Sequence, residues 1–363
     1  MKRLSLVPRL TGLAGPSNFQ RRLASGLEAR GVAVSYGLGD ESVDAVLVIG
    51  GSRNLAGLQR ARRRGVPILQ RLDGMNWIHR RRRTGLRHFL RAEANNVLLR
   101  FIRSRLADTV VYQSDFVRGW WERRYGAWRG RSAVIRNGVP LDIYSPGGPA
   151  RERAGGLRIV VLEGAIGGGY EIGLEWAAEL AGGLAQVRRT QVELMVAGRL
   201  SAKLPAQLPG SYELPGRSHR MNVAWLGEVA PDSVPEILRS GDLLFSADLH
   251  PACPNSVIES LACGLPVVAF DTGAVREIVD SESGAVVAYG GDAWKLDPPD
   301  TPALIRAAQE VLSEGERYRR GARRRAESAF GLDRMVDDYL AVLGWQSQPR
   351  ETGTRRQAGT FLQ

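Results

Sequence analysis

Cysteine is almost absent from this chain of 363 residues, which contains Cys253 and Cys263 and no others. Two cysteines cannot build a disulfide scaffold or a cysteine-based structural zinc site. Their scarcity is typical of a reducing compartment, so we expect a cytoplasmic location. The four histidines, at positions 79, 88, 219 and 250, lack the spacing of metal ligands.

Long apolar runs are missing as well. No stretch approaches the roughly 20 apolar residues that a membrane-spanning helix needs. The apolar stretch at the start is broken by Pro8 and is too short for a signal peptide, so it predicts a first β-strand. The chain also lacks the Gly-x-Ser-x-Gly elbow of serine hydrolases and the Walker phosphate loop.

Charge is distributed unevenly along the chain. Residues 1–150 hold 27 Lys and Arg against 10 Asp and Glu, whereas residues 151–363 hold 23 against 28. The first half therefore carries +17 and the second half −5, which together give the net charge of +12. A basic half joined to a mildly acidic half indicates that only the first half meets an anionic partner.

Short strands and helices alternate along both halves, which predicts two parallel sheets flanked by helices. Phe19, Leu23 and Leu27 recur every four residues and predict a helix with one buried face. Ser17 with Gln20 has capping-box spacing, and so has Ser233 with Glu236. The expected strands are 32–36, 45–49, 66–70, 109–113 and 133–136 in the first half, and 158–162, 193–197, 223–226, 242–246, 266–270 and 285–288 in the second.

The domain boundary is expected in the Pro- and Gly-rich stretch 144–156. We predict a first Rossmann-like domain over 1–145 and a second over 157–330. A closing helix over 331–345 and a loose polar tail over 346–363 complete the chain.

The most informative stretch begins at Cys253 and reads CPNSVIESLACGLPVV. It predicts a loop, a short helix and a buried strand, with free amides near Ser256 at the carboxyl ends of the strands, where phosphate-bearing ligands bind. Glu259 stands three residues after Ser256, which is capping-box spacing. A purely structural role for Glu259 is therefore the alternative to ligand binding.

This stretch, extended to PNSVIESLACGLPVVAFDTGAVREIV, resembles the nucleotide-binding signature of the retaining glycosyltransferases of family 4, which have the GT-B fold. The resemblance continues in GLAGPSNFQRRLASGLEARG, VIRNGVPLDIYSP, VAWLGEVAPDSVPEILRSGDLLFSA and FGLDRMVDDYLAVL. It covers about nine-tenths of the chain. It implies an α/β GT-B fold: two doubly wound Rossmann-like domains facing each other across a cleft, with a C-terminal helix that returns to the first domain.

The resemblance also implies a nucleotide-sugar donor held mostly by the second domain. Glu259 would accept hydrogen bonds from the ribose hydroxyls, because an ionised carboxylate only accepts. The other donor-binding residues that it implies are Gly12, Gly15, Gly164, Asn255, Ser256, Val257, Thr272, Gly273 and Glu277.

Two departures from the family pattern concern charge. The family has a Glu eight positions before Glu259, where this chain has Pro251; Asp248 and His250 are polar neighbours that could substitute. It also has an Arg and a Lys after the first strand of the second domain, where this chain has Ala165 and Gly168. A Gly-rich loop with free amides, such as the one from Gly164, can still hold an anion.

The catalytic residues expected are Asp73, Arg199 and Lys203. Arg199 and Lys203 follow the next strand and could supply the missing cationic charge, and the alternative is a solvated surface pair. Asp73 follows strand 66–70 and is expected in the cleft, with a simple Asp-Gly turn as the alternative. Asn76 and Trp77 add hydrogen-bonding and stacking groups nearby. Asn137 is compatible with a hinge, a binding residue or a plain turn.

A basic segment fills much of the first half. Residues 80–136 carry 15 arginines against four acidic residues. Within it, Leu86, Leu90, Leu98, Phe101 and Ile102 alternate with arginines in the pattern of an amphipathic helix. Such helices lie on anionic membranes, and the alternative is a helix packed on the domain with a solvated Arg face. Nucleic-acid binding is disfavoured because no recognised module or series of aromatic platforms is present.

The function implied is transfer of a hexose, with retention, from a UDP- or GDP-sugar to a glycan or lipid-linked acceptor, as in polysaccharide biosynthesis. No Asp-x-Asp motif is present, so we expect metal independence and no cofactor. The location expected is cytoplasmic, with peripheral contact to the inner face of the membrane. The alternative is a non-catalytic GT-B protein that binds a nucleotide sugar or a glycan.

Overall fold

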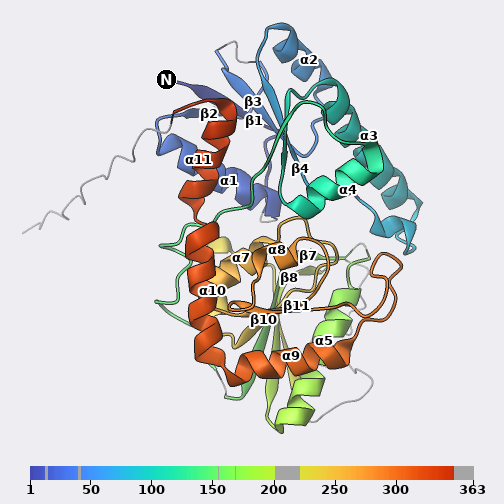
Figure 1. The fold of residues 1–363 in the computed structure, drawn as a ribbon, viewed down its shortest axis with the longest axis vertical. Coiled ribbons are helices and arrows are strands. Elements are labelled where there is room, and N and C mark those ends of the chain that lie inside the picture. Colours follow the sequence, from blue (N-terminus) through green and yellow to red (C-terminus); the bar gives the residue numbers. More distant parts are fainter. Residues whose placement is uncertain (13–14, 40–41, 154, 168, 201–220, 347–363) are drawn as a thin grey trace, which may run out of the picture.

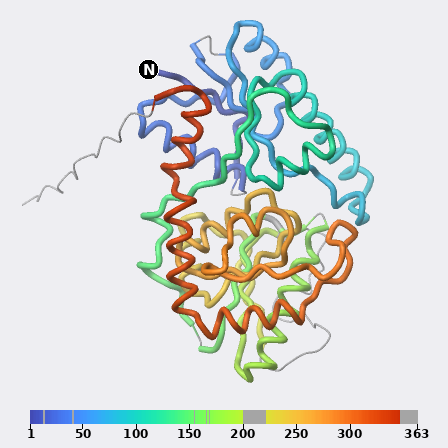
Figure 2. Tube along the Cα trace, viewed as in Figure 1, coloured from blue at the N-terminus to red at the C-terminus, as the bar shows by residue number. Residues whose placement is uncertain are grey.

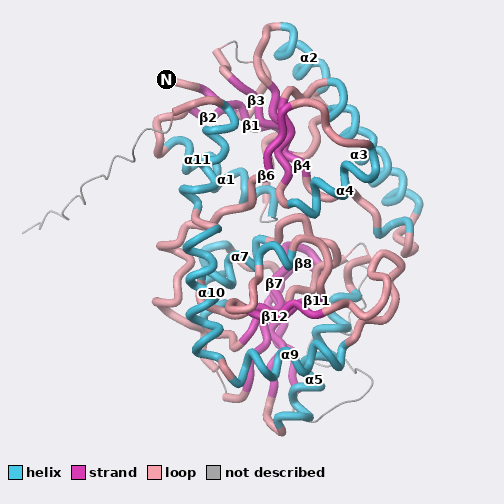
Figure 3. The backbone as a smooth tube through the Cα atoms, viewed as in Figure 1, coloured by secondary structure: helices cyan, strands magenta, loops and turns pink. Residues whose placement is uncertain are grey.

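The computed structural model of the protein describes residues 1–12, 15–39, 42–153, 155–167, 169–200 and 221–346. This part of the chain forms two domains, each with one parallel sheet flanked by helices (Figure 1, Figure 3). None of the helices in these ranges combines the length and the apolarity needed to cross a bilayer.

The first domain is built on a six-stranded sheet. Its strands are β1 (Arg3–Val7), β2 (Ala33–Ser35), β3 (Ala45–Ile49), β4 (Ile68–Leu72), β5 (Thr109–Tyr112) and β6 (Arg131–Val134). They are all parallel and run in the order β2-β1-β3-β4-β5-β6. Every residue of β3 and β4 is buried, as expected for strands covered on both faces.

Helices α1 (Gly15–Glu28), α2 (Leu55–Arg63), α3 (Leu86–Arg105) and α4 (Asp115–Tyr125), with the short η1 (Ile78–Arg80), flank this sheet. The predicted face of α1 is buried at Phe19, Leu23 and Leu27. The capping-box prediction for Ser17 is wrong, because the helix already begins at Gly15 and the Ser17 hydroxyl donates to the carbonyl of Thr11.

The second domain repeats the plan. Its strands are β7 (Leu157–Ile166), β8 (Val192–Leu200), β9 (Met221–Gly227), β10 (Leu243–Phe245), β11 (Val267–Phe270) and β12 (Gly284–Val287), in the order β12-β11-β10-β7-β8-β9. The order reverses between β7 and β10, which are adjacent in the sheet. Ligands of doubly wound sheets bind outside the carboxyl ends of strands at such a reversal.

The helices of this domain are α5 (Ile172–Arg188), η2 (Pro231–Ser233), α6 (Val234–Arg239), α7 (Asn255–Ala262), α8 (Val275–Ile278), α9 (Thr301–Ser313) and α10 (Gly315–Ala329). The Ser233 capping box is also wrong: Ser233 precedes α6 but makes no side-chain cap bond. Each expected strand overlaps a strand of one of the two sheets, although the bounds differ by up to four residues.

The last helix, α11 (Leu332–Leu343), returns to the first domain, as the resemblance implies (Figure 2). The chain passes from the first domain to the second near Val139 and returns near Gly331, and these two residues form a β-bridge. Val336 and Tyr339 of α11 join the core formed by α1 and β1. Gly26 of α1 permits this packing, because a Cβ atom there would collide with Val336. The predicted tail beyond Gln346 lies outside the described residues.

Candidate functional site

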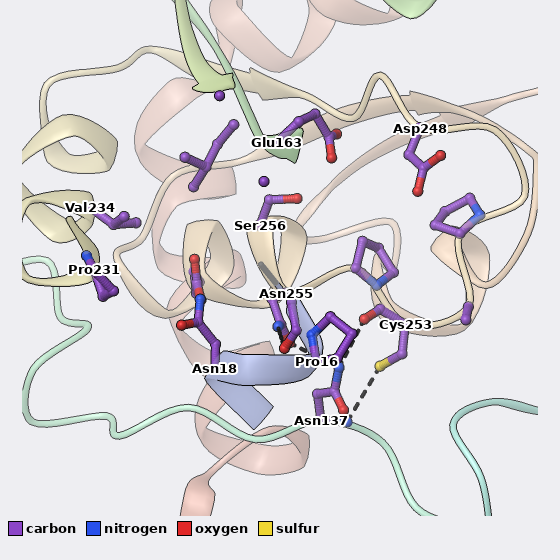
Figure 4. Close-up of a pocket in the computed structure, with 18 of the residues that line it drawn as sticks. Pro16, Asn18, Asn137, Glu163, Pro231, Val234, Asp248, Cys253, Asn255 and Ser256 are labelled. Carbon is purple, nitrogen blue, oxygen red and sulfur yellow. Dashed lines mark hydrogen bonds between the residues drawn. The ribbon is translucent and has the colours of Figure 1, made fainter. Parts of the chain in front are cut away.

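A cavity of about 320 Å³ lies where the two domains meet. The first domain contributes the start of α1, the ends of β4 and β5 and the linker at Asn137. The second contributes the ends of β7 and β8 and the loop that leads into α7 (Figure 4). Of the predicted site residues it brings together Gly15, Asp73, Gly164, Asn255, Ser256 and Glu259.

Asn137 fastens the start of α7 to the first domain. Its Nδ2 donates to Asn255 Oδ1 over 2.8 Å and to the carbonyl of Cys253 over 3.0 Å (Figure 4). Asn255 in turn donates to the carbonyl of Gly15, at 3.2 Å. Ser256 lines the cavity from the first turn of α7, and Val257 is fully buried in the domain core. Asn137 is thus buried and bridges the domains, which a plain turn residue would not do.

Glu259 is buried and lines the cavity from the second turn of α7. Its Oε1 accepts from Arg22 Nη2 of α1 over 2.6 Å. The capping-box alternative is wrong, because the residue before α7 is Pro254 and no side chain caps the helix. Burial raises the pKa of Glu259, and the charge of Arg22 acts in the opposite direction. The sequence did not single out Arg22.

Asp73 follows β4 and lines the cavity as predicted. Its carboxylate accepts from Arg71 Nη1 at 2.9 Å and from Gln113 Nε2. Arg71 is almost fully buried and also donates to Asn137, at 2.8 Å. Desolvation of the carboxyl raises the pKa of Asp73, and the positive charge of Arg71 partly offsets this rise. Asp73 is therefore joined to the α7 loop through Arg71 and Asn137, a link that the sequence did not reveal.

Two further carboxylates, Glu163 and Asp248, line the cavity from the second domain. Glu163 lies near the end of β7, and Asp248 lies three residues beyond β10, so both flank the reversal of strand order. Figure 4 shows them on the same side of the cavity, beyond Ser256. Burial raises the pKa of both, and repulsion from Asp248 raises that of Glu163 further. Glu163 was missed, although its position at a strand end was a usable signal.

The remaining predicted residues lie around the cavity rather than in its lining, among the residues that the structure describes. Gly12 has φ +94° in the loop after β1. Thr272 accepts from the amide of His250, and Gly273 packs so closely on Pro251 that a Cβ would collide with it. Arg199 is exposed at the end of β8, next to Gly198, which does line the cavity. Lys203 lies outside the described residues.

Glu277 bridges the domains. Its carboxylate accepts from the backbone amides of Asp115 and Phe116, at 2.9 and 2.6 Å, and from Arg136 at 2.6 Å. The two amides begin α4, where the helix dipole and unpaired amides favour a negative charge. Glu277 thus holds the second domain against the first domain.

We expect Glu277→Ala to lower the free energy of unfolding by about 2 kcal/mol, because charged hydrogen bonds to a helix start are lost. The domains should also separate more readily, which small-angle X-ray scattering and limited proteolysis can detect. Arg276→Ala, a change of an exposed neighbour on α8, is the matched control. Equal stability and scattering of both variants would contradict the bridging role.

An aromatic cluster closes the domain interface beside the cavity. Trp77, Phe116 and Trp120 come from the first domain, and His250 and Trp294 from the second. His250 stacks on Trp294 with ring centroids 3.6 Å apart, and Trp77 meets both edge-on. Burial lowers the pKa of His250 to about 4, so the ring is neutral at pH 7. Trp77 was expected to stack, but its partners come from a distant part of the chain.

His250 should make the fold sensitive to acid. Its pKa is lower in the folded protein than its ordinary value of 6.5, so the unfolded chain binds more protons and stability falls as pH drops from about 6.5 to 4. His250→Asn should remove up to about 3 kcal/mol of the stability that the parent loses over this pH range. Asn is chosen because it tolerates the positive φ of 54° at this position. Urea unfolding at pH 7.5 and pH 4.5 measures it. An unchanged difference between the two pH values would contradict this role.

Comparison with known proteins finds a family match within the second domain. Residues 158–314 match the family model described as Glycosyl transferases group 1. A D-inositol 3-phosphate glycosyltransferase of Geodermatophilus obscurus is 29% identical over 251 residues, 66% of this chain and 53% of that protein. A GDP-mannose-dependent alpha-(1-6)-phosphatidylinositol dimannoside mannosyltransferase of Mycobacterium tuberculosis is 32% identical over 112 residues, 31% of this chain and 27% of that protein. The chain thus spans from about a quarter to about half of the length of these relatives.

Solved structures define the fold. Sucrose-phosphate synthase from Thermosynechococcus elongatus superposes with a TM-score of 0.72 at 14% identity, covering 94% of this chain and 98% of that chain. Anabaena HepE in complex with UDP-glucose gives 0.65 at 15% identity, covering 95% and 99%. The predicted fold class is confirmed: the chain has the two-domain α/β GT-B fold. The match to the Glycosyl transferases group 1 model falls within its second domain.

Proposed function

We propose that the protein transfers a hexose from a UDP- or GDP-sugar to a glycan or lipid-linked acceptor, with retention of configuration and without a metal. The observation that carries this proposal is the cavity itself: Asn255, Ser256 and Glu259 of the donor signature meet Gly15 and Asp73 of the first domain there. The family match and the named activities of the relatives support it. In this mechanism the protein orients the donor and stabilises the leaving diphosphate.

A thermal-shift panel of nucleotides and nucleotide sugars tests donor binding. A ligand at 100 times its dissociation constant should stabilise the fold by about 2.7 kcal/mol. UDP-glucose or GDP-mannose should raise the melting temperature, and ATP should not. A panel in which no uridine or guanosine compound shifts the melting temperature would contradict the proposal.

Non-catalytic binding of a nucleotide sugar is the second candidate. Glu163 and Asp248 line the cavity near the start of α7, and two carboxylates disfavour a developing diphosphate charge unless they are protonated or offset by a cation. Arg199 and Lys203 remain the proposed source of that cation, with Arg199 next to Gly198 of the lining. Release of UDP or GDP from a donor in the absence of acceptor separates the two candidates, because a binder releases none.

The acceptor is proposed to meet the first domain. A second cavity, of about 610 Å³, is lined by Arg53, Asn76, His88, Arg91 and their neighbours on α3. Asn76 of this cavity lies three residues after Asp73, which lines the cavity proposed for the donor. Its cationic groups suit an acceptor that carries a phosphate.

Helix α3 supports peripheral contact with the cytoplasmic face of an anionic membrane. Leu86, Leu90 and Val97 are exposed on it by 74, 59 and 64%. Arg87 and Arg91 are exposed on the same helix. Large apolar and cationic side chains together favour an anionic lipid surface.

We expect Arg87→Ser with Arg91→Ser to weaken binding to phosphatidylserine-containing vesicles about 30-fold, since each surface Arg contributes about 1 kcal/mol. Arg80 and Arg82 are unsuitable because Arg80 pairs with Glu93 and Arg82 donates to the carbonyl of Gly169. Co-sedimentation at low and high salt measures binding, with Arg60→Ser plus Arg63→Ser on α2 as the control. Equal binding to neutral and anionic vesicles would show that the helix is ordinary surface.

A further inference from the structure

Arg22 is a buried cation that the first domain places against the donor signature of the second. It lies in the middle of α1, and its side chain is 11% exposed. Its Nη2 donates to Glu259 Oε1 over 2.6 Å, and the side chain of Glu259 is 5% exposed. This ion pair joins residues 237 positions apart in the chain.

Tyr144 is the second partner of Arg22, through a side-chain hydrogen bond and its aromatic ring. The guanidinium of Arg22 lies over the ring of Tyr144, with 5.0 Å from the guanidinium carbon to the ring centroid. Its Nη1 is buried and finds no hydrogen-bond acceptor in the described part of the chain. A buried Arg with one unsatisfied nitrogen is costly, so its contact with Glu259 needs a reason beyond stability.

The pair engages one of the two carboxylate oxygens of Glu259. The residue also lines the cavity, so the other oxygen is left for a ligand. One turn earlier on α7, Asn255 donates to the carbonyl of Gly15 at the start of α1. Helix α1 therefore holds α7 at two successive turns, and the donor side of the cavity is complete only when the two domains are together.

The electrostatics of Glu259 agree with this arrangement. Burial raises the pKa of its carboxyl, and the charge and hydrogen bond of Arg22 both lower it. Without Arg22, burial would act alone and the pKa would rise further. More of the carboxyl would then carry a proton near neutral pH, and a protonated carboxyl accepts fewer hydrogen bonds.

We propose that Arg22 is a positioning residue for the donor: it holds Glu259 by one oxygen so that the other accepts hydrogen bonds from the ribose hydroxyls of the donor. This inference rests on the proposed function, because it assumes that the cavity takes a nucleotide sugar. It adds that α1 of the first domain supplies part of the donor site through Arg22.

The test is titration calorimetry with UDP-glucose and GDP-mannose from pH 6.0 to 8.5, a range in which the diphosphate of a nucleotide sugar does not titrate. The variants are Arg22→Gln, Arg22→Lys and Glu259→Gln, with Arg60→Gln on α2 as the control for net charge. The parent and the control should bind one donor with nearly constant affinity. Arg22→Gln should bind about tenfold more weakly at pH 6.0 and approach the parent as pH rises and Glu259 ionises again.

Arg22→Lys should restore most of the affinity, and Glu259→Gln should bind weakly at every pH. Parent affinity and a flat pH profile in Arg22→Gln would overturn the inference. So would an equal loss at every pH that Lys does not rescue, since that indicates a purely structural contact. If the parent binds a donor and Glu259→Gln binds it equally well, the inference fails while the proposed function stands; if the parent binds neither donor, both fail.

Discussion

Glu259→Ala should destabilise the protein by about 3–5 kcal/mol and abolish measurable donor binding. The carboxylate is the charge partner of the buried Arg22, and removal of one member of a buried ion pair leaves the other uncompensated. From the sequence, the loss would have been limited to the roughly 1 kcal/mol of a helix cap. Urea unfolding measures the change in the free energy of unfolding.

The matched control is the double variant Arg22→Met with Glu259→Leu. Replacement of a whole buried ion pair by apolar side chains of similar size is often neutral for stability. The double variant should therefore recover the stability lost in Glu259→Ala and still fail to bind a donor. A Glu259→Ala protein with parent stability would show that the pair does not stabilise the domain interface.

Asp73→Asn should lower the turnover of the donor by about 100-fold, within the range for a positioned acid or base. Arg71 and Gln113 fix the carboxylate at the cavity wall, and an amide of the same size can neither accept a proton nor carry a charge there. The dissociation constant of the donor should change less than threefold, because Asp73 lies on the first-domain side of the cavity.

The assay for Asp73→Asn is release of UDP or GDP from the donor without acceptor, combined with calorimetry of donor binding. Asp142→Asn, a change of an exposed Asp outside the cavity, is the control. Unchanged turnover in Asp73→Asn would support the Asp-Gly turn as its whole role. A loss of donor affinity equal to the loss of turnover would assign Asp73 to ground-state binding.

The fold was predictable because its signals are local. Strands such as β3 and β4 are short, mostly apolar runs, and the face of α1 follows from the repeat of Phe19, Leu23 and Leu27. Capping was predicted less well. Ser17 and Ser256 have the spacing of a capping box, but each lies inside a helix that begins one or two residues earlier. Spacing alone does not fix which residue begins a helix.

The candidate site was predictable only where a motif named its members. Asn255 and Glu259 belong to the stretch that resembles a nucleotide-binding signature, and Asp73 follows a strand, so all three were expected in the cavity that they line. Arg22 and Arg71 were missed because each reads as one arginine among many in a basic half. Their burial depends on partners in distant segments, namely Glu259 for Arg22 and Asn137 for Arg71. The stack of His250 on Trp294 was missed for the same reason. His250 lies in the loop before α7 and Trp294 in the loop after β12, and no periodicity in the sequence relates the two loops.

The central claim is that the protein transfers a hexose with retention of configuration and that the reaction takes place in the cavity between the domains. Proton NMR of the purified protein with UDP-glucose or GDP-mannose tests it most directly, because it follows nucleotide release and the anomer of the hexose first released to water. The account predicts release of one nucleoside diphosphate, with an α-hexose appearing before mutarotation and with the signal about 100-fold slower in Asp73→Asn. Release of a β-hexose, or no release above a heat-denatured control with either donor, would contradict it.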